Sequence, residues 1–243
     1  MCIRDSAYPR YDAQNNKSTK TAAGWSQAKP VYLLSDKATI WAYYPYNQAV
    51  ADGTKVPVPI NAGTSVDYMW GKSTNQVSVI ETDAVIPMKH ALSQLVIRLK
   101  VSPEYHNDGN LTSAKLKSKA AKFGTSGTMN LNDNGRIIFS PTSTELSWTP
   151  NTTIPAQGNP SVDFAAAIYP MSLASGEVSM EVVIDGATYT YSIPQISWEA
   201  GKRYIYSITM RSNDAEIGGE NGQSVTIEPW GSSESDVTLV PVK

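Results

Sequence analysis

The segment Trp198-Glu-Ala-Gly-Lys-Arg-Tyr-Ile-Tyr-Ser-Ile-Thr-Met210, with Val225-Thr-Ile-Glu-Pro-Trp230 after it, decides the fold class of this 243-residue chain. In the first segment a large side chain recurs at every second position, at Tyr204, Tyr206, Ile208 and Met210. This is the period of a β-strand with one buried face. The second segment alternates in the same way until Pro229 stops the run. A pair of such strands ending in a tryptophan predicts a β-sandwich or barrel, and it indicates no catalysis.

Three further motifs precede these two segments in the chain: Ile40-Trp-Ala-Tyr-Tyr-Pro-Tyr46, Asp67-Tyr-Met69 and Met88-Lys-His-Ala-Leu-Ser-Gln-Leu-Val-Ile-Arg-Leu99. In their order the five motifs resemble the fimbrillin-like family, the shaft and tip subunits of the type V pili of Bacteroidetes-type bacteria. The family pattern runs from A-Y-Y-P-Y and D-x-M, through H-A-L-x-x-L-x-x-x-L, to W-x-A-G-x-x-Y-x-Y and I-x-P-W. The resemblance covers roughly residues 38–230.

This resemblance implies an all-β protein with two tandem β-sandwich domains of the fimbrillin-like, transthyretin-like kind. It implies a structural or adhesive subunit of a cell-surface fimbria at the outer membrane, with no enzymatic activity and no cofactor. The implied partners are other fimbrial subunits, together with host or bacterial surface ligands. In such proteins a surface protease removes the first strand of the N-terminal domain, and a strand of a neighbouring subunit fills the groove. A lipid anchor belongs to the full-length precursor.

Composition and charge argue against several other classes of protein. The formal net charge of −2 gives no electrostatic reason to expect nucleic acid. The apolar runs are too short for a membrane span, and one cysteine, Cys2, can form no intrachain disulfide. Residues 1–6 look like a cloning or assembly scar, and compared with the family we expect the first strand or strands to be missing.

Turn-forming residues predict where the domains divide and where hairpins form. The proline-rich polar stretch 149–161 predicts a boundary between an N-terminal domain, 1–150, and a C-terminal domain, 151–243. Residues 7–30 are polar and predict irregular structure. Asn134-Gly135 and Asp185-Gly186 predict β-hairpins, because both positions of each pair tolerate a positive φ. Strands are expected near 31–34, 38–44, 56–60, 76–80, 94–102, 112–118, 127–131, 162–169, 177–184, 187–193, 203–210, 224–229 and 236–242.

Several short motifs imitate chemical sites. Gly71-Lys-Ser-Thr74 ends like a phosphate-binding loop, but Val66 stands where the first glycine belongs. Residues 130–135 begin like a calcium loop, yet the final ligand position holds a proline. His90 and His106 are the only histidines, and we interpret the first as a structural residue and the second as a solvated one. We therefore predict no metal, nucleotide or hydrolase site.

The C-terminal segment 236–243 is the candidate donor strand. It alternates after the Gly/Ser-rich stretch 231–235, and its apolar residues are Val237, Leu239, Val240 and Val242. The competing interpretation is an ordinary last strand of the second sandwich. Arg10, a basic residue in a polar segment, is the candidate protease site.

The aromatic residues allow a second function. Trp41 and Tyr43 share one face of a predicted strand, which indicates a core position. Tyr44, Tyr46 and Trp70 would stack on sugars if they formed one exposed flat patch, as in a glycan-binding surface lipoprotein module. Trp230 is expected to anchor a strand end.

Overall fold

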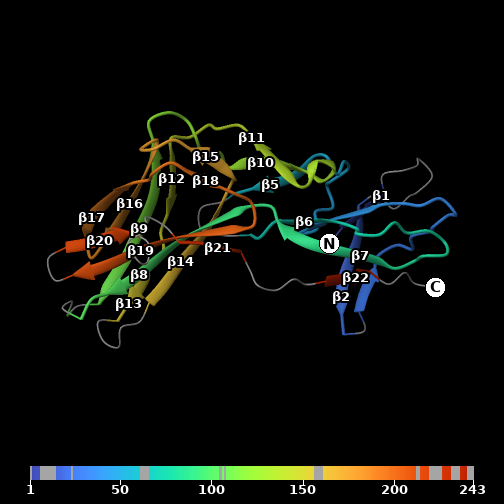
Figure 1. The fold of residues 1–243 in the computed structure, drawn as a ribbon, viewed down its shortest axis with the longest axis horizontal. Coiled ribbons are helices and arrows are strands. Elements are labelled where there is room, and N and C mark those ends of the chain that lie inside the picture. Colours follow the sequence, from blue (N-terminus) through green and yellow to red (C-terminus); the bar gives the residue numbers. More distant parts are fainter. Residues whose placement is uncertain are drawn as a thin grey trace.

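The computed structural model describes residues 2–5, 15–22, 24–60, 66–103, 106, 108–155, 161–211, 214–218, 226–230 and 236–239. Within these residues the regular elements are β-strands, apart from the short 3-10 turn η1 (Leu131–Asp133). The predicted all-β fold is therefore confirmed. Figure 1 shows two lobes side by side along the long axis of the molecule.

The first lobe is built on a curved seven-stranded sheet. Its order is β22 (Asp236–Leu239), β7 (Ala84–His90), β6 (Met69–Lys72), β4 (Ile40–Tyr44), β1 (Cys2–Asp5), β2 (Asn16–Thr21) and β3 (Gly24–Gln27). The two ends of this order approach each other, because β22 lies near β3 as well as beside β7. A three-stranded sheet belongs to the same lobe, in the order β11 (Arg136–Phe139), β10 (Ser126–Asn130) and β5 (Val56–Pro59).

The second lobe is a sandwich of two larger sheets. One has the order β12 (Glu145–Trp148), β9 (Gly109–Ser118), β16 (Val178–Ile184) and β17 (Ala187–Ser192), and β13 (Thr152–Ile154) also pairs with β9. The other has the order β14 (Ser161–Ile168), β8 (Ser93–Val101), β19 (Lys202–Arg211) and β20 (Asp214–Gly218), with β21 (Thr226–Pro229) on β19. A small antiparallel pair, β15 (Met171–Leu173) and β18 (Ile196–Trp198), completes the lobe.

Strict alternation builds the core of the second lobe. Every second residue of β16 is buried, and its inward side chains are Val178, Met180, Val182 and Ile184. They pack against the inward residues of the facing sheet, among them Tyr204 and Tyr206. Each fully buried apolar side chain contributes about 1.5–3 kcal/mol relative to exposure.

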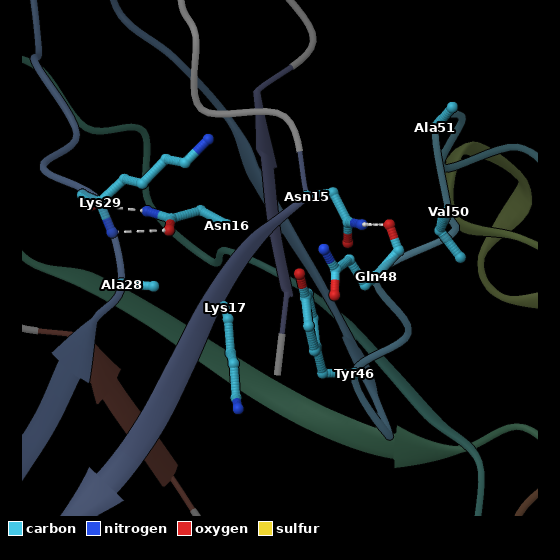
Figure 2. A pocket seen from close by; sticks show the side chains of 9 residues that line it. All are labelled: Asn15, Asn16, Lys17, Ala28, Lys29, Tyr46, Gln48, Val50 and Ala51. Carbon is cyan, nitrogen blue, oxygen red and sulfur yellow. Dashed lines mark hydrogen bonds between the residues drawn. The ribbon is translucent and has the colours of Figure 1, made fainter.

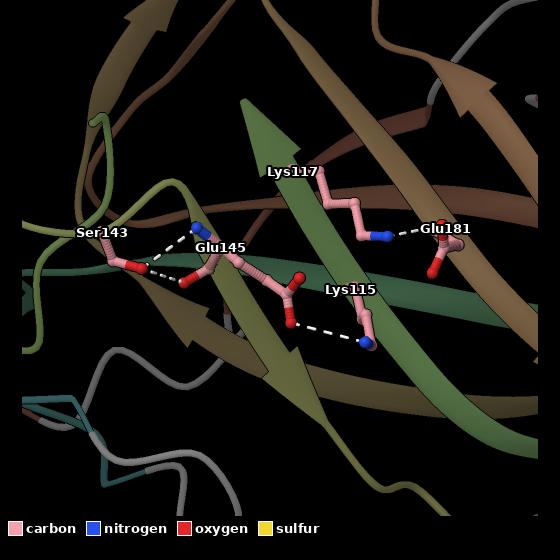
Figure 3. A network of polar contacts seen from close by, with 5 residues as sticks. All are labelled: Lys115, Lys117, Ser143, Glu145 and Glu181. Carbon is pink, nitrogen blue, oxygen red and sulfur yellow. Dashed lines mark hydrogen bonds and ion pairs between the residues drawn. The ribbon is translucent and has the colours of Figure 1, made fainter. Parts of the chain in front are cut away.

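The outward face of the same sheet carries paired charges. Lys117 Nζ lies 2.7 Å from Glu181 Oε2, and Lys115 Nζ lies 3.4 Å from Glu145 Oε1. Figure 3 shows the four side chains crossing between β12, β9 and β16. Lys115 and Lys117 therefore point to the outer face of the strand, while Ala114 and Leu116, which alternate with them, are buried.

Three expectations about organisation are wrong. Strand pairing crosses the predicted boundary within 149–161, because β8 and β9 share sheets with β14 and β16. The stretch 7–30, predicted to be irregular, contains β2 and β3. Residues 31–34 form no strand, and of residues 76–80 only Val77 makes an isolated bridge, to Ala38. Along 31–34 the exposure of the side chains alternates without the ladder of hydrogen bonds that makes a sheet, and the chain bends at residues 79–80.

Both predicted hairpins are confirmed. Asp185 and Gly186, with φ values of 51° and 79°, connect β16 to β17. Asn134 and Gly135, with φ values of 50° and 68°, precede β11. The second loop is longer than the expected two-residue turn, because η1 lies between β10 and Asn134.

Candidate functional site

The C-terminal strand β22 does not belong to the second lobe. It pairs antiparallel with β7 of the first lobe, in the register Asp236 to Pro87 through Leu239 to Ala84. The preceding strand, β21, pairs with β19 of the second lobe. The chain therefore returns to the first lobe within residues 231–235, and an ordinary last strand of the second sandwich is excluded for residues 236–239. Figure 1 shows β22 against β7, close to β2.

Four of the five sequence motifs meet where the two lobes join. His90 Nδ1 lies 2.9 Å from Asp67 Oδ1, and its ring stacks on Trp230 with 4.6 Å between centroids and 9° between planes. Because an ionised carboxylate only accepts, Nδ1 donates this bond. The backbone N–H of Trp230 donates to Gly201 O (2.7 Å), and that of Gly201 donates to Leu92 O (2.9 Å). His90 and Trp230 are thus structural residues, as predicted.

The W-x-A-G-x-x-Y-x-Y motif also has a structural role. The Tyr204 hydroxyl donates to Ser197 O (2.6 Å) and accepts from Glu199 N–H (2.7 Å). Trp198 Nε1 donates to the buried Tyr206 hydroxyl at 3.3 Å. Burial raises the pKa of both tyrosines above the ordinary value, since desolvation opposes the phenolate. These phenols hold the turn between β18 and β19 and remain neutral.

Tyr169, which the sequence did not single out, ties the lobes together from the other side. It follows β14 of the second lobe, yet its ring stacks on Phe139 of the first (4.5 Å between centroids). Its hydroxyl donates to Val58 O, and burial raises its pKa to about 12. A Cβ at Gly127 would lie 2.9 Å from this ring, so a glycine is required there.

The three candidate stacking aromatics do not form one patch. Tyr43 stands opposite Trp70 and Tyr44 opposite Met69 in the β4–β6 register, so Tyr44 and Trp70 lie on opposite faces. Trp70 is covered by the hairpin turn, since a Cβ on Gly135 would lie 2.1 Å from its Cδ1. Tyr46 packs with Trp70 against the first-lobe core. Trp41 and Tyr43 belong to that core, as predicted.

The segments that resemble a phosphate-binding loop and a calcium loop have structural roles. Gly71 and Lys72 lie in β6 rather than in a loop, and a Cβ at Gly71 would lie 2.7 Å from Pro87 O. Residues 130–135 form the hairpin connection. Among the described residues no three His, Cys, Asp or Glu side chains gather as metal ligands. Nor does that part of the chain contain a helix long and apolar enough to cross a membrane.

Of the candidate donor-strand and protease-site residues, only two lie within the described residues. Val237 and Leu239 lie in β22, opposite Ile86 and Ala84. Arg10, Val240 and Val242 lie outside the described residues. The acceptor strand β7 was missed, although Ala84-Val-Ile86 alternates at the start of the strand and its first and third residues are buried.

Comparisons with known proteins give one consistent result. The sequence model of a family described as fimbrillin-like matches residues 4–230. A candidate cell adhesion protein from Bacteroides uniformis has a similar fold, with TM-score 0.71, 18% identity, and coverage of 95% of this chain and 90% of that one. A fimbrial protein from Bacteroides vulgatus has TM-score 0.55, 15% identity and coverages of 90% and 86%. No curated protein matches the chain in sequence.

Proposed function

This chain belongs to the fimbrillin-like family, and we propose that it joins its neighbours in a fimbria by exchanging a β-strand. The family makes it a fimbrial or adhesive subunit of a cell-surface appendage, which is a structural role and not an enzymatic one. Its partners are accordingly other fimbrial subunits. What we add is the means by which those subunits connect.

The position of β22 carries the proposal. This strand lies on a lobe other than the one its chain has just left, and only residues 231–235 separate it from Trp230. An extended chain spans roughly 3.3–3.6 Å per residue, so this connection reaches at most about 20 Å. A strand held by so short a connection on a foreign lobe can be exchanged for the same strand of a neighbouring copy. The exchange keeps every main-chain hydrogen bond and only changes which chain supplies it.

The acceptor side fits this exchange. Without β22, β7 would be an edge of its sheet among the described strands, with unpaired N–H and C=O groups. Directly behind that edge lies a small core that contains Ala84 and Ile86 of β7. An added strand therefore satisfies backbone groups and covers apolar surface together. These are the two sources of affinity and register in β-strand addition.

The proposal extends to the ends of the chain. We propose that the donor includes Val240 and Val242 beyond β22, that cleavage near Arg10 prepares the acceptor, and that the precursor carries a lipid anchor at the outer membrane. Family resemblance supports the last two points. The glycan-binding lipoprotein module, in the form that requires Tyr44, Tyr46 and Trp70 on one surface, is not favoured by their placement on two faces of the sheet.

Deletion of residues 236–243 tests the proposal. Cells that express the shortened chain should lose surface filaments in electron micrographs, while the purified chain keeps a cooperative unfolding transition. β22 pairs with β7 of the first lobe, so the second lobe should unfold as before. A shortened chain that still assembles would overturn strand donation by this segment.

A further inference from the structure

Three apolar residues are exposed together at one end of the first lobe. They are Leu34 (45% exposed), Val79 (57%) and Ile80 (88%). The N–H of Val79 donates to Leu34 O (2.8 Å), so the two segments that carry these residues lie side by side. In Figure 1 the connection between β6 and β7, which contains Val79 and Ile80, lies at the end of the first lobe that points away from the second lobe. We call these three residues the apolar tip.

The turn at Val79 and Ile80 does not require apolar residues. The N–H of Ser78 donates to Glu81 O (2.8 Å), which closes the hairpin between β6 and β7. Ser78 Oγ accepts from the N–H groups of Ile80 (3.4 Å) and Glu81 (3.3 Å), and these bonds hold the bend. Turns usually have Gly, Asn, Asp or Ser at such positions. Two β-branched apolar residues there, next to an exposed leucine, indicate a surface that another segment covers.

The segment before Leu34 is anchored at both ends. At one end, Asn16 Nδ2 donates to Lys29 O (2.7 Å) and Asn16 Oδ1 accepts from Lys29 N–H (3.1 Å), as Figure 2 shows. At the other end, Leu33 packs against the small core behind β7, next to the bond between Val79 and Leu34. The apolar tip is therefore held in place before any partner arrives, which lowers the entropic cost of covering it.

The strand β22 runs toward this tip. Its last residue, Leu239, stands opposite Ala84, the first residue of β7. Antiparallel pairing directs the following residues toward the turn that precedes β7. Residues 240–243, Val-Pro-Val-Lys, lie outside the described residues, and we call them the C-terminal tail. Four residues span at most about 13–14 Å, which is also the span of residues 80–83, so the tail is long enough to reach the tip.

We infer that the C-terminal tail covers the apolar tip. Val240 and Val242 supply apolar side chains for it. Pro241 between them has no N–H and cannot continue the ladder of β22, so side-chain contacts rather than backbone bonds hold the tail. The inference deepens the donor role proposed for residues 236–243. It requires only the pairing of β22 with β7, whichever copy supplies the strand.

Charge favours the tail over two other partners. Glu81 and Asp83 are exposed next to the turn, and Lys243 carries the one charged side chain of the tail. The tip of a second copy would bring like charges together, and an anionic lipid surface would repel both acids. The tail therefore matches the tip in polarity and in charge.

Uncovering the tip tests the inference on the purified full chain. Deletion of residues 240–243 should raise the fluorescence of an uncharged, polarity-sensitive dye, because the tip becomes open to it. Adding Val79→Ser and Ile80→Ser to the deletion should abolish the increase. Adding Ile138→Ser instead, at a position of β11 that is 63% exposed, should leave the increase unchanged.

Charge reversal tests the same contact without shortening the chain. Lys243→Glu should raise the dye fluorescence, because the tail is then repelled by Glu81 and Asp83. Adding Glu81→Lys should reverse part of that rise, and the reversal should weaken as ionic strength increases. A rise that Glu81→Lys leaves unchanged at low ionic strength would contradict the pairing of Lys243 with these acids.

A short bismaleimide locates the tail directly. In a Cys2→Ser background, Ile80→Cys and Val242→Cys should become linked, whereas Ile138→Cys and Val242→Cys should not. Links within one chain and links between copies both support the inference, and the size of the product distinguishes them.

Two results would overturn the inference. One is a deletion of residues 240–243 that leaves the dye fluorescence unchanged. The other is a link from residue 242 that forms no more readily at position 80 than at position 138. Because neither measurement needs filaments, such a failure leaves strand exchange untouched, and a loss of filaments leaves these measurements untouched.

Discussion

The imidazole of His90 stacks face to face on the indole of Trp230, with 4.6 Å between the ring centroids. His90 ends β7, the strand that holds β22, while Trp230 follows β21, the last strand of the second lobe. The stack therefore fixes the point from which the chain leaves toward β22. The end of β7 and the start of the connection to β22 therefore meet at this one contact.

Removing the indole should loosen this point. Trp230→Ala is expected to lower the free energy of unfolding by about 2–3 kcal/mol, less than the 3–5 kcal/mol typical of a fully buried ring, because Trp230 is only half-buried. His90→Phe keeps a ring for stacking and loses only the bond to Asp67, so about 1 kcal/mol is expected. Urea unfolding measures both. A larger loss for His90→Phe than for Trp230→Ala would show that the hydrogen bond, not the stack, holds the junction.

The Gly135 turn gives a sharper test of packing. Gly135→Ala combines a positive φ of 68° with a Cβ placed 2.1 Å from Trp70 Cδ1. Gly186→Ala has a φ of 79° and no atom within 4 Å of the new Cβ. The second variant should lose about 1 kcal/mol through backbone strain, and the first at least about 2 kcal/mol more. Similar losses in chemical denaturation would contradict the contact between the turn and Trp70.

Tyr169 predicts a loss of stability at high pH. Its pKa is raised to about 12 by burial, against about 10 in the unfolded chain. The folded state therefore retains a proton that the unfolded state releases, so this stabilisation is complete below pH 10 and is lost between pH 10 and 12. Tyr169→Phe keeps the stack on Phe139 and loses the bond to Val58 O, so it should cost about 1–2 kcal/mol at pH 7. The difference between the two proteins should shrink as the pH rises toward 12. A constant difference in pH-dependent unfolding would contradict burial of this phenol.

Asp163 predicts the opposite dependence in acid. Hydrogen bonds from Arg98 at 2.8 and 2.9 Å hold the pKa of Asp163 below its usual value. The stabilisation is therefore complete above the unfolded pKa of about 3.9 and is lost as the pH falls through the lower folded value. Asp163→Asn should destabilise the protein at pH 7 and cease to matter in strong acid. The matched control is Asp133→Asn. Asp133 Oδ2 lies 3.7 Å from Arg136 Nη1 in an exposed ion pair, so this variant should change the stability little at either pH. An effect of Asp163→Asn that persists in strong acid would contradict this pairing.

Local patterns in the sequence predicted local structure well. The alternation of β16 and the positive-φ pair Asp185-Gly186 depend on neighbours in sequence, and both are found as expected. The domain boundary predicted within 149–161 was wrong, because turn-forming residues mark where a chain bends and not which sheet the next strand joins. The sequence did not predict on which side of the sheet Tyr46 and Trp70 lie, because this depends on which strands pair and on where the alternation of a strand ends. The contacts of Asn15 with Asn47 and of Asn16 with Lys29 were missed because they join residues distant in sequence.

Crosslinking across the β22–β7 pair tests strand exchange most directly. Thr238 stands opposite Val85, and facing residues of an antiparallel pair have Cα atoms about 4.5–5.5 Å apart, within the range of a disulfide. In a Cys2→Ser background, Thr238→Cys and Val85→Cys are placed on separate copies that assemble together. Strand exchange predicts disulfide-linked pairs of chains in the filaments, and none when Thr238→Cys is replaced by Thr190→Cys, an exposed position on β17 of the second lobe. Filaments in which the mixed single variants remain uncrosslinked, while one chain carrying both cysteines closes on itself, would contradict the account.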